Sequence, residues 1–366
     1  MIYLFILTVS IFVLYIVDSN KKYSKSATFI VIFIVCMFNA LFAGLQYGVG
    51  TDYYSYLGMF KNQEYQKFYI KNEYIYYLFY RFIELFDGDP QWIFVLSSVF
   101  NGFFLTLTLY LLKKYGYGIT FIFFVYFSYT GMYHNQMNGL RQFSAIYIFN
   151  FLMVYAAVLG FRKTLFWLVL FMGISSHKTF LGILPFFSLY FFNRKDSCKL
   201  VVPILIGIVI IIFMLYSLPY IVNEYFPFYV GYLTSDYGST LDITALATKL
   251  ILLPLLIYFV YVFYSNINFR ENFLNSHKGF CELLFLWGTT SLLYLVSLEY
   301  GFFYRVSQYF LFANVFPLYY LFKYIVYEKK SILLLFLLIS YIFLPYLVKV
   351  VFLPSGEYLY HMYGFF

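Results

Sequence analysis

The chain has 366 residues, of which 63% are apolar, 27% are aromatic and only 11% are charged. Soluble domains carry roughly 25% charged residues, so this composition excludes a water-soluble globule and also a disordered chain. The formal net charge of +8 does not indicate a nucleic-acid partner, because in a membrane protein the position of each basic residue matters more than their sum. The composition predicts an integral membrane protein.

Long apolar runs follow one another along the whole chain. A spanning helix needs about 20 apolar residues, because every backbone polar group must be satisfied within the segment. The sequence therefore predicts an all-α, polytopic protein with about twelve spans, some of them short or broken, in a single membrane domain over residues 1–366. In chain order the runs are Ile2–Val17, Ala27–Leu45, Trp92–Leu112, Ile119–Tyr133, Phe143–Leu159, Thr164–Ile174, Phe180–Phe192, Leu200–Leu218, Leu250–Tyr264, Phe280–Leu298, Val306–Tyr324 and Ile332–Val351.

Basic residues occupy every second connection between these runs. This alternation is the positive-inside pattern, so we expect these connections to face the cytoplasm and both ends of the chain to lie outside it. The first run is expected to be an anchor, because its lysines follow it and no cleavage site is visible. The basic residues are Lys21, Lys22, Lys25, Lys113, Lys114, Arg162, Lys163, Arg194, Lys195, Lys199, Arg270, Lys278, Lys329 and Lys330.

Two of the predicted outward connections are long. Residues 46–91 contain closely spaced tyrosines and phenylalanines beside lysines, which predicts amphipathic helices in the outer membrane interface. Residues 219–249 are rich in Tyr, Gly, Ser and Thr, and we expect a second interfacial loop there.

Ionisable residues in or beside a span are costly and are candidate functional residues. Once the cytoplasmic basic clusters are set aside, the candidates all fall at predicted outward ends of helices. They are Asp52, His134, Arg141, His177, Lys178, Glu299 and Arg305.

Asp52 belongs to the segment Gly48–Tyr53, directly after the second predicted span. Its two glycines allow a tight turn or a close approach to a ligand. Two interpretations are open and compatible with each other. Asp52 is the N-cap of the following helix, or its carboxylate acts on a substrate as a general base.

Arg141 and Arg305 are each expected at the outward start of a helix. A helix start offers free N–H groups, and the planar arginine fork adds donors that match a phosphate or pyrophosphate. Asn138 and Gln142 flank Arg141, and Gln308 shares a helical face with Arg305. The two helix starts together predict a cradle for a doubly charged group, and the alternative is that the arginines extend to lipid headgroups.

The polar segment Ser175–Thr179 lies between two runs that are each too short to span. Such a break is tolerated where it faces protein or a water-filled cavity. We expect a re-entrant hairpin whose tip, with His177 and Lys178, lines the active cavity. An ordinary outer loop between tilted helices is the alternative.

The segment Asp87–Asp89 has the Asp-x-Asp spacing of a metal-dependent glycosyltransferase. Pro90 follows directly, so a turn is expected there instead of a metal site.

At these motifs the chain resembles the EpsG-like branch of the Wzy-type O-antigen and exopolysaccharide repeat-unit polymerases. The resemblance covers nearly the whole length, although each motif is short. One departure is Gln46-Tyr47, where family members often carry an arginine. The residues that carry the resemblance are Gly48, Val49, Gly50, Thr51, Asp52, Tyr53, Tyr56, Asn138, Arg141, Gln142, Ala145, Ser176, His177, Lys178, Thr179, Tyr304 and Arg305.

The resemblance implies a GT-C-like membrane glycosyltransferase in the bacterial inner membrane, with its active face outside the cytoplasm. It would transfer a growing glycan from undecaprenyl pyrophosphate to a new lipid-linked repeat unit. Implied partners are that oligosaccharide, membrane lipids, a chain-length regulator and a flippase, with no nucleic acid. No cofactor and no metal is required, because arginine and lysine can balance the pyrophosphate.

The resemblance also implies roles for individual residues. Asp52 would be the general base, and Arg141 and Arg305 with Lys178 would hold the pyrophosphate. His177 would donate a hydrogen bond to a phosphate or assist proton transfer. Further substrate contacts are expected from Tyr53, Asn138, Gln142, Tyr304 and Gln308.

Two alternatives come from other functions. A lipid-linked oligosaccharide flippase would also be polytopic, but its charges should be distributed through the depth of the membrane, whereas these cluster at outer ends. An O-antigen ligase is a second glycan-transferring membrane enzyme, and a scaffolding subunit would not need two arginine-bearing helix starts.

Overall fold

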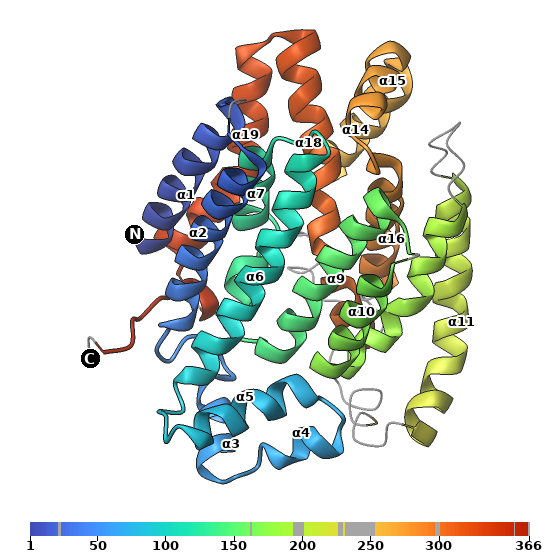
Figure 1. Ribbon diagram of the computed structural model, residues 1–366. Helices are drawn as coiled ribbons and strands as arrows, with labels where there is room; N and C mark the ends of the chain where they lie inside the picture. The colour runs from blue at the N-terminus through green and yellow to red at the C-terminus, as the bar shows by residue number, and fades with distance from the viewer. Residues whose placement is uncertain are drawn as a thin grey trace. The chain divides into compact units, whose positions relative to one another are not determined.

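The computed structural model describes residues 1–20, 23–161, 163–192, 201–225, 230, 253–296, 301–354 and 356–364. Their regular structure is helical throughout (Figure 1), apart from one isolated antiparallel bridge between Gln46 and Met362. The chain forms two compact units: unit 1 is Met1–Phe180 with Ile325–Phe366, and unit 2 is Leu181–Tyr324. The predicted all-α, polytopic fold is confirmed.

Unit 1 holds the helices of the first half of the chain and the last apolar helix. Five helices in the described part of the chain are long and apolar enough to cross a membrane: α1, α2, α6, α9 and the continuous segment of α19 and η5. The elements of this unit are α1 (Ile2–Ser19), α2 (Lys25–Gly44), α3 (Tyr53–Lys61), α4 (Gln66–Ile70), α5 (Tyr74–Leu85), α6 (Trp92–Lys114), α7 (Ile119–Ser128), α8 (Met132–Asn135), α9 (Leu140–Leu159), α10 (Thr164–Ser176), the π-helix η4 (Ile325–Lys329), α19 (Ile332–Leu347), the π-helix η5 (Val348–Phe352) and the 3₁₀ turn η6 (Gly356–Tyr358).

The helix α9 is the core of unit 1. In the 18-residue apolar stretch of α9, 89% of the residues are buried, against 33% in the corresponding stretch of α1. The burial is high because α9 packs against both α6 and α10. The contact between α2 and α6 is close: a Cβ atom on Gly102 would lie 2.9 Å from the Cβ of Ala40. Small residues at such crossings let apolar helices approach closely enough for extensive van der Waals contact.

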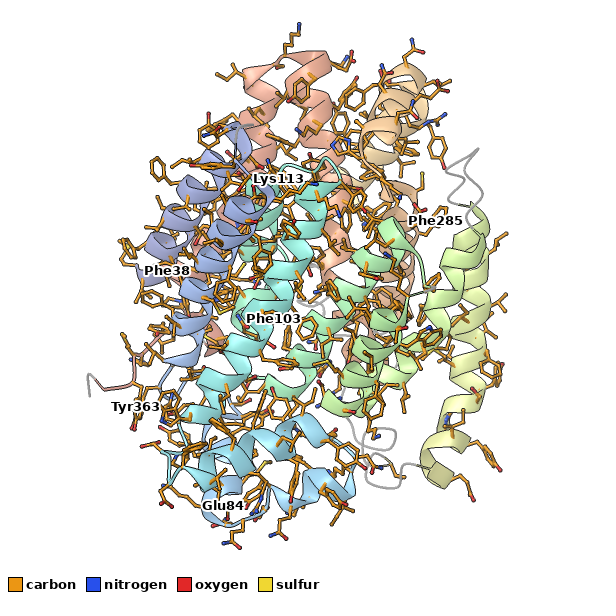
Figure 2. All side chains as sticks on the ribbon, in the orientation of Figure 1. Phe38, Glu84, Phe103, Lys113, Phe285 and Tyr363 are labelled. Atoms are coloured by element: carbon orange, nitrogen blue, oxygen red, sulfur yellow. The ribbon has the colours of Figure 1, made fainter. Side chains whose placement is uncertain are left out.

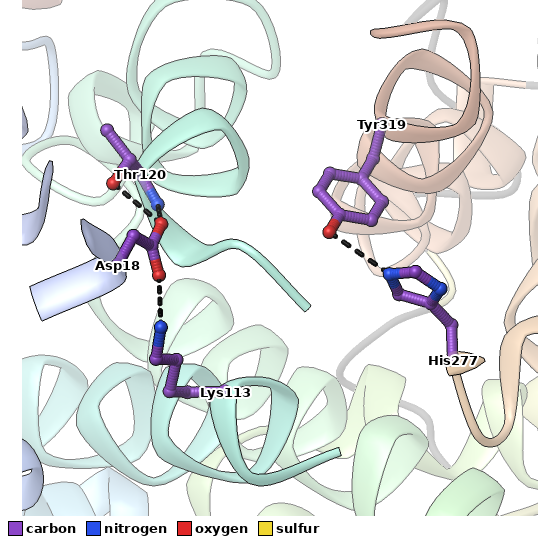
Figure 3. Close-up of polar contacts among 5 residues, drawn as sticks. All are labelled: Asp18, Lys113, Thr120, His277 and Tyr319. Carbon is purple, nitrogen blue, oxygen red and sulfur yellow. Dashed lines mark hydrogen bonds and ion pairs between the residues drawn. The ribbon is translucent and has the colours of Figure 1, made fainter. Parts of the chain in front are cut away.

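The two ends of α6 carry different structures. At its C-terminal end, Lys113 Nζ lies 2.7 Å from Asp18 Oδ1, and Asp18 Oδ2 accepts hydrogen bonds from the backbone and hydroxyl of Thr120 (Figure 3). The short helices α3, α4 and α5 lie at the opposite end (Figure 1), where Glu84 is labelled in Figure 2. The predicted helices of residues 46–91 are therefore present, at the end of unit 1 remote from the basic connection at Lys113.

Unit 2 contains the remaining helices. Here α16 packs against α11, α17 and η3, while α14 packs against α18. The ring of His277 stacks on Phe273, and its Nε2 lies 3.2 Å from Tyr319 Oη (Figure 3). The elements are α11 (Val201–Tyr225), α14 (Leu253–Ser265), α15 (Ile267–Ser276), α16 (Phe280–Val296), α17 (Gly301–Gln308), η3 (Leu311–Asn314) and α18 (Val315–Tyr324). The 3₁₀ helix η1 (Lys178–Phe192) begins in unit 1 and continues into unit 2.

Three predicted boundaries differ from the structure. The run Ile119–Tyr133 ends as a helix at Ser128, because Gly131 adopts a left-handed conformation with φ of 70°. The helix α11 continues through Pro219 to Tyr225, so the first residues of the interfacial loop predicted over 219–249 are helical. Residues 226–229 and 231–249 lie outside the described part of the chain.

The third difference is in the run Val306–Tyr324. It is not one helix: α17 ends at Gln308, and a 3₁₀ turn separates it from α18. Continuous hydrophobicity does not reveal such a break, because the residues of the 3₁₀ turn are themselves largely apolar.

Candidate functional site

The Asp52 turn has a backbone that favours glycine at two positions. Gly48 and Gly50 have φ values of 61° and 79°, a region that other L-residues rarely adopt. A Cβ atom on Gly50 would lie only 2.8 Å from Asn138 Oδ1. The turn is therefore pressed against the loop that precedes α9.

Asn138 joins the turn to that loop through its side-chain oxygen. Asn138 Oδ1 accepts hydrogen bonds from the backbone N–H of Asp52 (3.0 Å) and from Thr51 Oγ1 (3.2 Å). Asn138 was predicted to contact substrate, and in this structure it fixes the backbone of the candidate base.

Asp52 occupies the N-cap position of α3, as one interpretation of the sequence held, but its side chain makes no capping hydrogen bond. The residue is exposed. A carboxylate whose backbone is fixed and whose oxygens do not cap the helix can act on a bound hydroxyl.

Arg141 lies in the first turn of α9, as predicted. Its Nη1 is 2.5 Å from Glu73 Oε2, and its guanidinium lies over the Phe68 ring with Cζ 4.6 Å from the centroid. The Glu73 side chain is fully buried and that of Arg141 is 21% exposed. The side chain is thus bound to the α4–α5 turn, which argues against its extending to lipid headgroups.

Glu73 was not singled out from the sequence. It is an isolated acid in a tyrosine-rich segment, 68 positions from Arg141, so no local pattern indicates the pair. Its complete burial would be costly without a cation, and burial becomes visible only in the structure.

Two lysines share the electrostatic environment of this pair. Burial and the charge of Arg141 lower the pKa of Lys71, whereas Glu73 raises it. Lys178, the first residue of η1, interacts electrostatically with Glu73. Helix α10, which ends just before Lys178, packs against both α5 and α9. Lys178 is therefore within electrostatic range of Glu73, the ion-pair partner of Arg141.

The Tyr56 hydroxyl interacts electrostatically with both Asp52 and Arg141. Burial raises the pKa of the Tyr56 hydroxyl, while the charge of Arg141 and a hydrogen bond to its side chain lower it, and the charge of Asp52 raises it further. Asp52 and Arg141 thus both interact electrostatically with Tyr56 in unit 1.

His177 is the C-cap of α10 and is buried. Its Nδ1 accepts a hydrogen bond from the backbone N–H of Thr179 (3.2 Å) and lies 2.8 Å from Thr179 Oγ1. Because Nδ1 is an acceptor here, the neutral ring carries its proton on Nε2. The break between two short helices that the sequence predicts at this point is present.

Three further predicted residues of unit 1 differ in exposure. Tyr53 is fully buried and donates a hydrogen bond to Gln91 Oε1 (2.6 Å), so it supports the turn, and its contact with a substrate stays a prediction. Gln142 is half-buried beside Arg141. His134 is fully buried beneath the Tyr358 ring, at 4.4 Å between centroids, and burial lowers its pKa to about 3; the imidazole stays neutral within unit 1.

The predicted placement of Arg305 at a helix start is wrong. Arg305 lies in the last turn of α17, and Gln308 ends that helix. The charge is favourable there because it faces the negative end of the helix dipole, but the free N–H groups of a helix start are absent. Arg305 and Gln308 are half-buried in unit 2. The side chain of Tyr304, and all of Glu299, lie outside the described part of the chain.

Comparison with known proteins identifies the family of the chain. No curated protein and no solved structure matches the chain. The family model described as the EpsG family matches residues 29–363, a range that includes the Asp52 turn, both arginines and the break at His177. The protein belongs to the EpsG family.

Proposed function

We propose that the protein is a polysaccharide repeat-unit polymerase. Membership of the EpsG family implies a role in exopolysaccharide biosynthesis. The polymerase would move a growing glycan from undecaprenyl pyrophosphate to the sugar of a new lipid-linked repeat unit, at the outer face of a bacterial inner membrane. The observation that carries the proposal is the exposed Asp52 carboxylate, whose backbone is bound to Asn138 three residues before Arg141.

The Asp52 carboxylate would act on the acceptor. It takes the proton of the attacking sugar hydroxyl while the new C–O bond forms at the donor's anomeric carbon. The bond from that carbon to the pyrophosphate breaks, and the pyrophosphate leaves with the electron pair. Asn138 contributes by fixing the Asp52 backbone, which limits the carboxylate to few orientations.

The basic cluster would act on the donor. Arg141 is ion-paired with the buried carboxylate of Glu73, and Lys71 and Lys178 also interact electrostatically with Glu73, so three cationic side chains share one buried anion in this cluster. Glu73 and Phe68 hold one edge and one face of the guanidinium. An anion with several oxygens would neutralise the excess positive charge and accept charge-assisted hydrogen bonds.

The remaining predicted residues have supporting roles in this proposal. Gln142 and His177 would donate hydrogen bonds at the edge of the cluster. Arg305, Gln308 and Tyr304 stay proposed contacts of the lipid-linked substrate. Membrane lipids would surround the spans, and a flippase and a chain-length regulator would supply and limit the substrate.

The proposal is tested with the purified protein in lipid nanodiscs and a single lipid-linked repeat unit as the only substrate. A ladder of glycans that grows by one repeat unit supports a polymerase. Movement of the repeat unit across a vesicle membrane without any ladder would instead identify a flippase. Transfer that requires a different acceptor would identify a ligase.

A further inference from the structure

Residues 356–363 form a strap that pairs with the chain immediately before the Asp52 turn. The backbone N–H of Tyr47 donates to the carbonyl of His361 (2.8 Å), and that of Tyr363 donates to the carbonyl of Leu45 (2.7 Å). These bonds flank the antiparallel bridge of this unit. A segment more than 300 positions away in sequence therefore determines the path of the chain that enters the turn.

Asp89 ties this strap to the start of α6. Its Oδ2 accepts a hydrogen bond from Tyr363 Oη (2.8 Å), and its Oδ1 accepts one from the backbone N–H of Gln91 (2.7 Å). Figure 2 places Tyr363 toward the end of the unit where Glu84 lies. The turn predicted at Asp87–Asp89 is present, with Gly88 N–H bonded to Ile83 O at 2.9 Å. The two carboxylate oxygens of Asp89 thus accept hydrogen bonds from two different segments of the chain, the strap and the residue before α6.

Gln91 bonds both to the chain that enters the Asp52 turn and to the residue that follows Asp52. Its Nε2 donates to the carbonyls of Gln46 (2.6 Å) and Gly44 (3.2 Å), while its Oε1 accepts from Tyr53 Oη (2.6 Å). Gln91 is buried, so these bonds are not exchanged readily with water. Tyr53 directly follows Asp52, and the strap, Asp89 and Gln91 therefore act on the turn through bonds separate from those of Asn138.

We propose that Asp89 is a positioning residue for Asp52. This inference rests on the proposed function of Asp52. Two glycines at positive φ make the turn conformationally permissive, and Asn138 restrains it only through Thr51 and Asp52. The strap and Gln91, both bonded to Asp89, restrain the residues that enter the turn and Tyr53 that follows it, and would thereby limit the orientations of the Asp52 carboxylate.

The kinetic test compares Asp89→Ala, Asp89→Asn, Tyr363→Phe and the double variant Asp89→Ala with Tyr363→Phe. Asp89→Ala should lower kcat about tenfold with KM within about twofold of wild type, because misplacing a reacting group slows the chemical step. Tyr363→Phe should also lower kcat. The kcat of the double variant should be no lower than that of Asp89→Ala, because Tyr363→Phe removes a hydrogen bond that Asp89→Ala has already removed.

Asp89→Asn provides the rescue. Its amide oxygen can still accept from Gln91 N–H, and its amide nitrogen can donate to the Tyr363 oxygen, so kcat should stay close to wild type. The matched control is Tyr69→Phe, the same change at an exposed tyrosine of α4, which should leave kcat unchanged.

A readout independent of turnover is amide hydrogen exchange over residues 45–52. Exchange should be faster in Asp89→Ala than in wild type and normal in Asp89→Asn, at an unchanged melting temperature. Wild-type exchange and wild-type kcat in Asp89→Ala would overturn the inference, as would a raised KM at unchanged kcat. If the wild-type protein forms no ladder, the proposed function fails, and the exchange measurement still decides whether Asp89 holds the turn.

Discussion

At the scale of single residues, Arg141 combines two kinds of contact that lysine cannot reproduce. Its planar group bonds Glu73 at one edge and stacks on Phe68 with one face. Lysine would keep the charge but lose the fork and the flat face. The same geometry that holds the guanidinium in place would present its other donors to a phosphate oxygen.

We therefore expect Arg141→Lys to lose most of its polymerising activity, by more than about tenfold, while the protein still inserts into the membrane. Arg305→Lys is expected to lose activity as well, because lysine cannot reproduce the bidentate bonds proposed between Arg305 and the pyrophosphate. Glycan ladders from the purified variants measure this. Arg81→Lys, at an exposed arginine paired with Glu84, is the control, and normal ladders from both site variants would remove these arginines from the chemistry.

Glu73 should contribute more to the free energy of unfolding than an exposed glutamate such as Glu64 does. Glu73→Gln leaves the partly buried Arg141 without its anion, and we expect a loss of about 2 kcal/mol in the free energy of unfolding. Thermal unfolding of the detergent-solubilised variant measures the loss. Glu64→Gln removes the exposed pair with Lys67 and should leave the melting temperature unchanged; equal melting temperatures for the two variants would contradict this account of the pair.

At the scale of elements, the contact between the Asp52 turn and the loop before α9 depends on Gly50. An alanine there would need a left-handed conformation, at about 1–2 kcal/mol, and its Cβ would displace Asn138. Gly50→Ala should therefore abolish chain growth. The control is Gly58→Ala on α3, where nothing lies within 4 Å of the added carbon; activity in Gly50→Ala equal to that in Gly58→Ala would show that the contact is dispensable.

The elements also show what the sequence could predict. Runs such as Trp92–Leu112 predicted their helices because a spanning helix must be continuously apolar and satisfy its own backbone. The breaks at Gly131 and after Gln308 lie within or beside apolar stretches, so hydrophobicity alone did not reveal them.

The site could be predicted only in part, for a related reason. Asp52, Asn138 and Arg141 stand in local motifs with glycine or amide neighbours. Glu73 and Asp89 have no such motif, because their partners Arg141 and Tyr363 come from remote segments of the chain. Long-range pairing depends on packing, which a single sequence does not display.

At the scale of the whole molecule, the orientation in the membrane decides which substrates reach Asp52. The helices α3, α4 and α5 lie at the end of α6 opposite Lys113 (Figures 1 and 2), and the basic connections are expected in the cytoplasm. Reporters fused after Lys114, Lys163 or Lys330 should indicate the cytoplasm, and one inserted near Gln63 should indicate the outside. A cytoplasmic Gln63 would place the candidate site on the wrong face for a polymerase of exported glycans.

The most direct test of the account compares wild type with Asp52→Asn in two measurements on purified protein: formation of the glycan ladder and binding of a lipid-pyrophosphate glycan. The asparagine keeps the size of the side chain but cannot take a proton from the acceptor. We expect the ladder to be lost while donor binding stays within about twofold of wild type, because the ground-state charges that attract the donor are on Arg141 and the lysines. Ladder growth by Asp52→Asn at a rate near wild type would contradict this expectation.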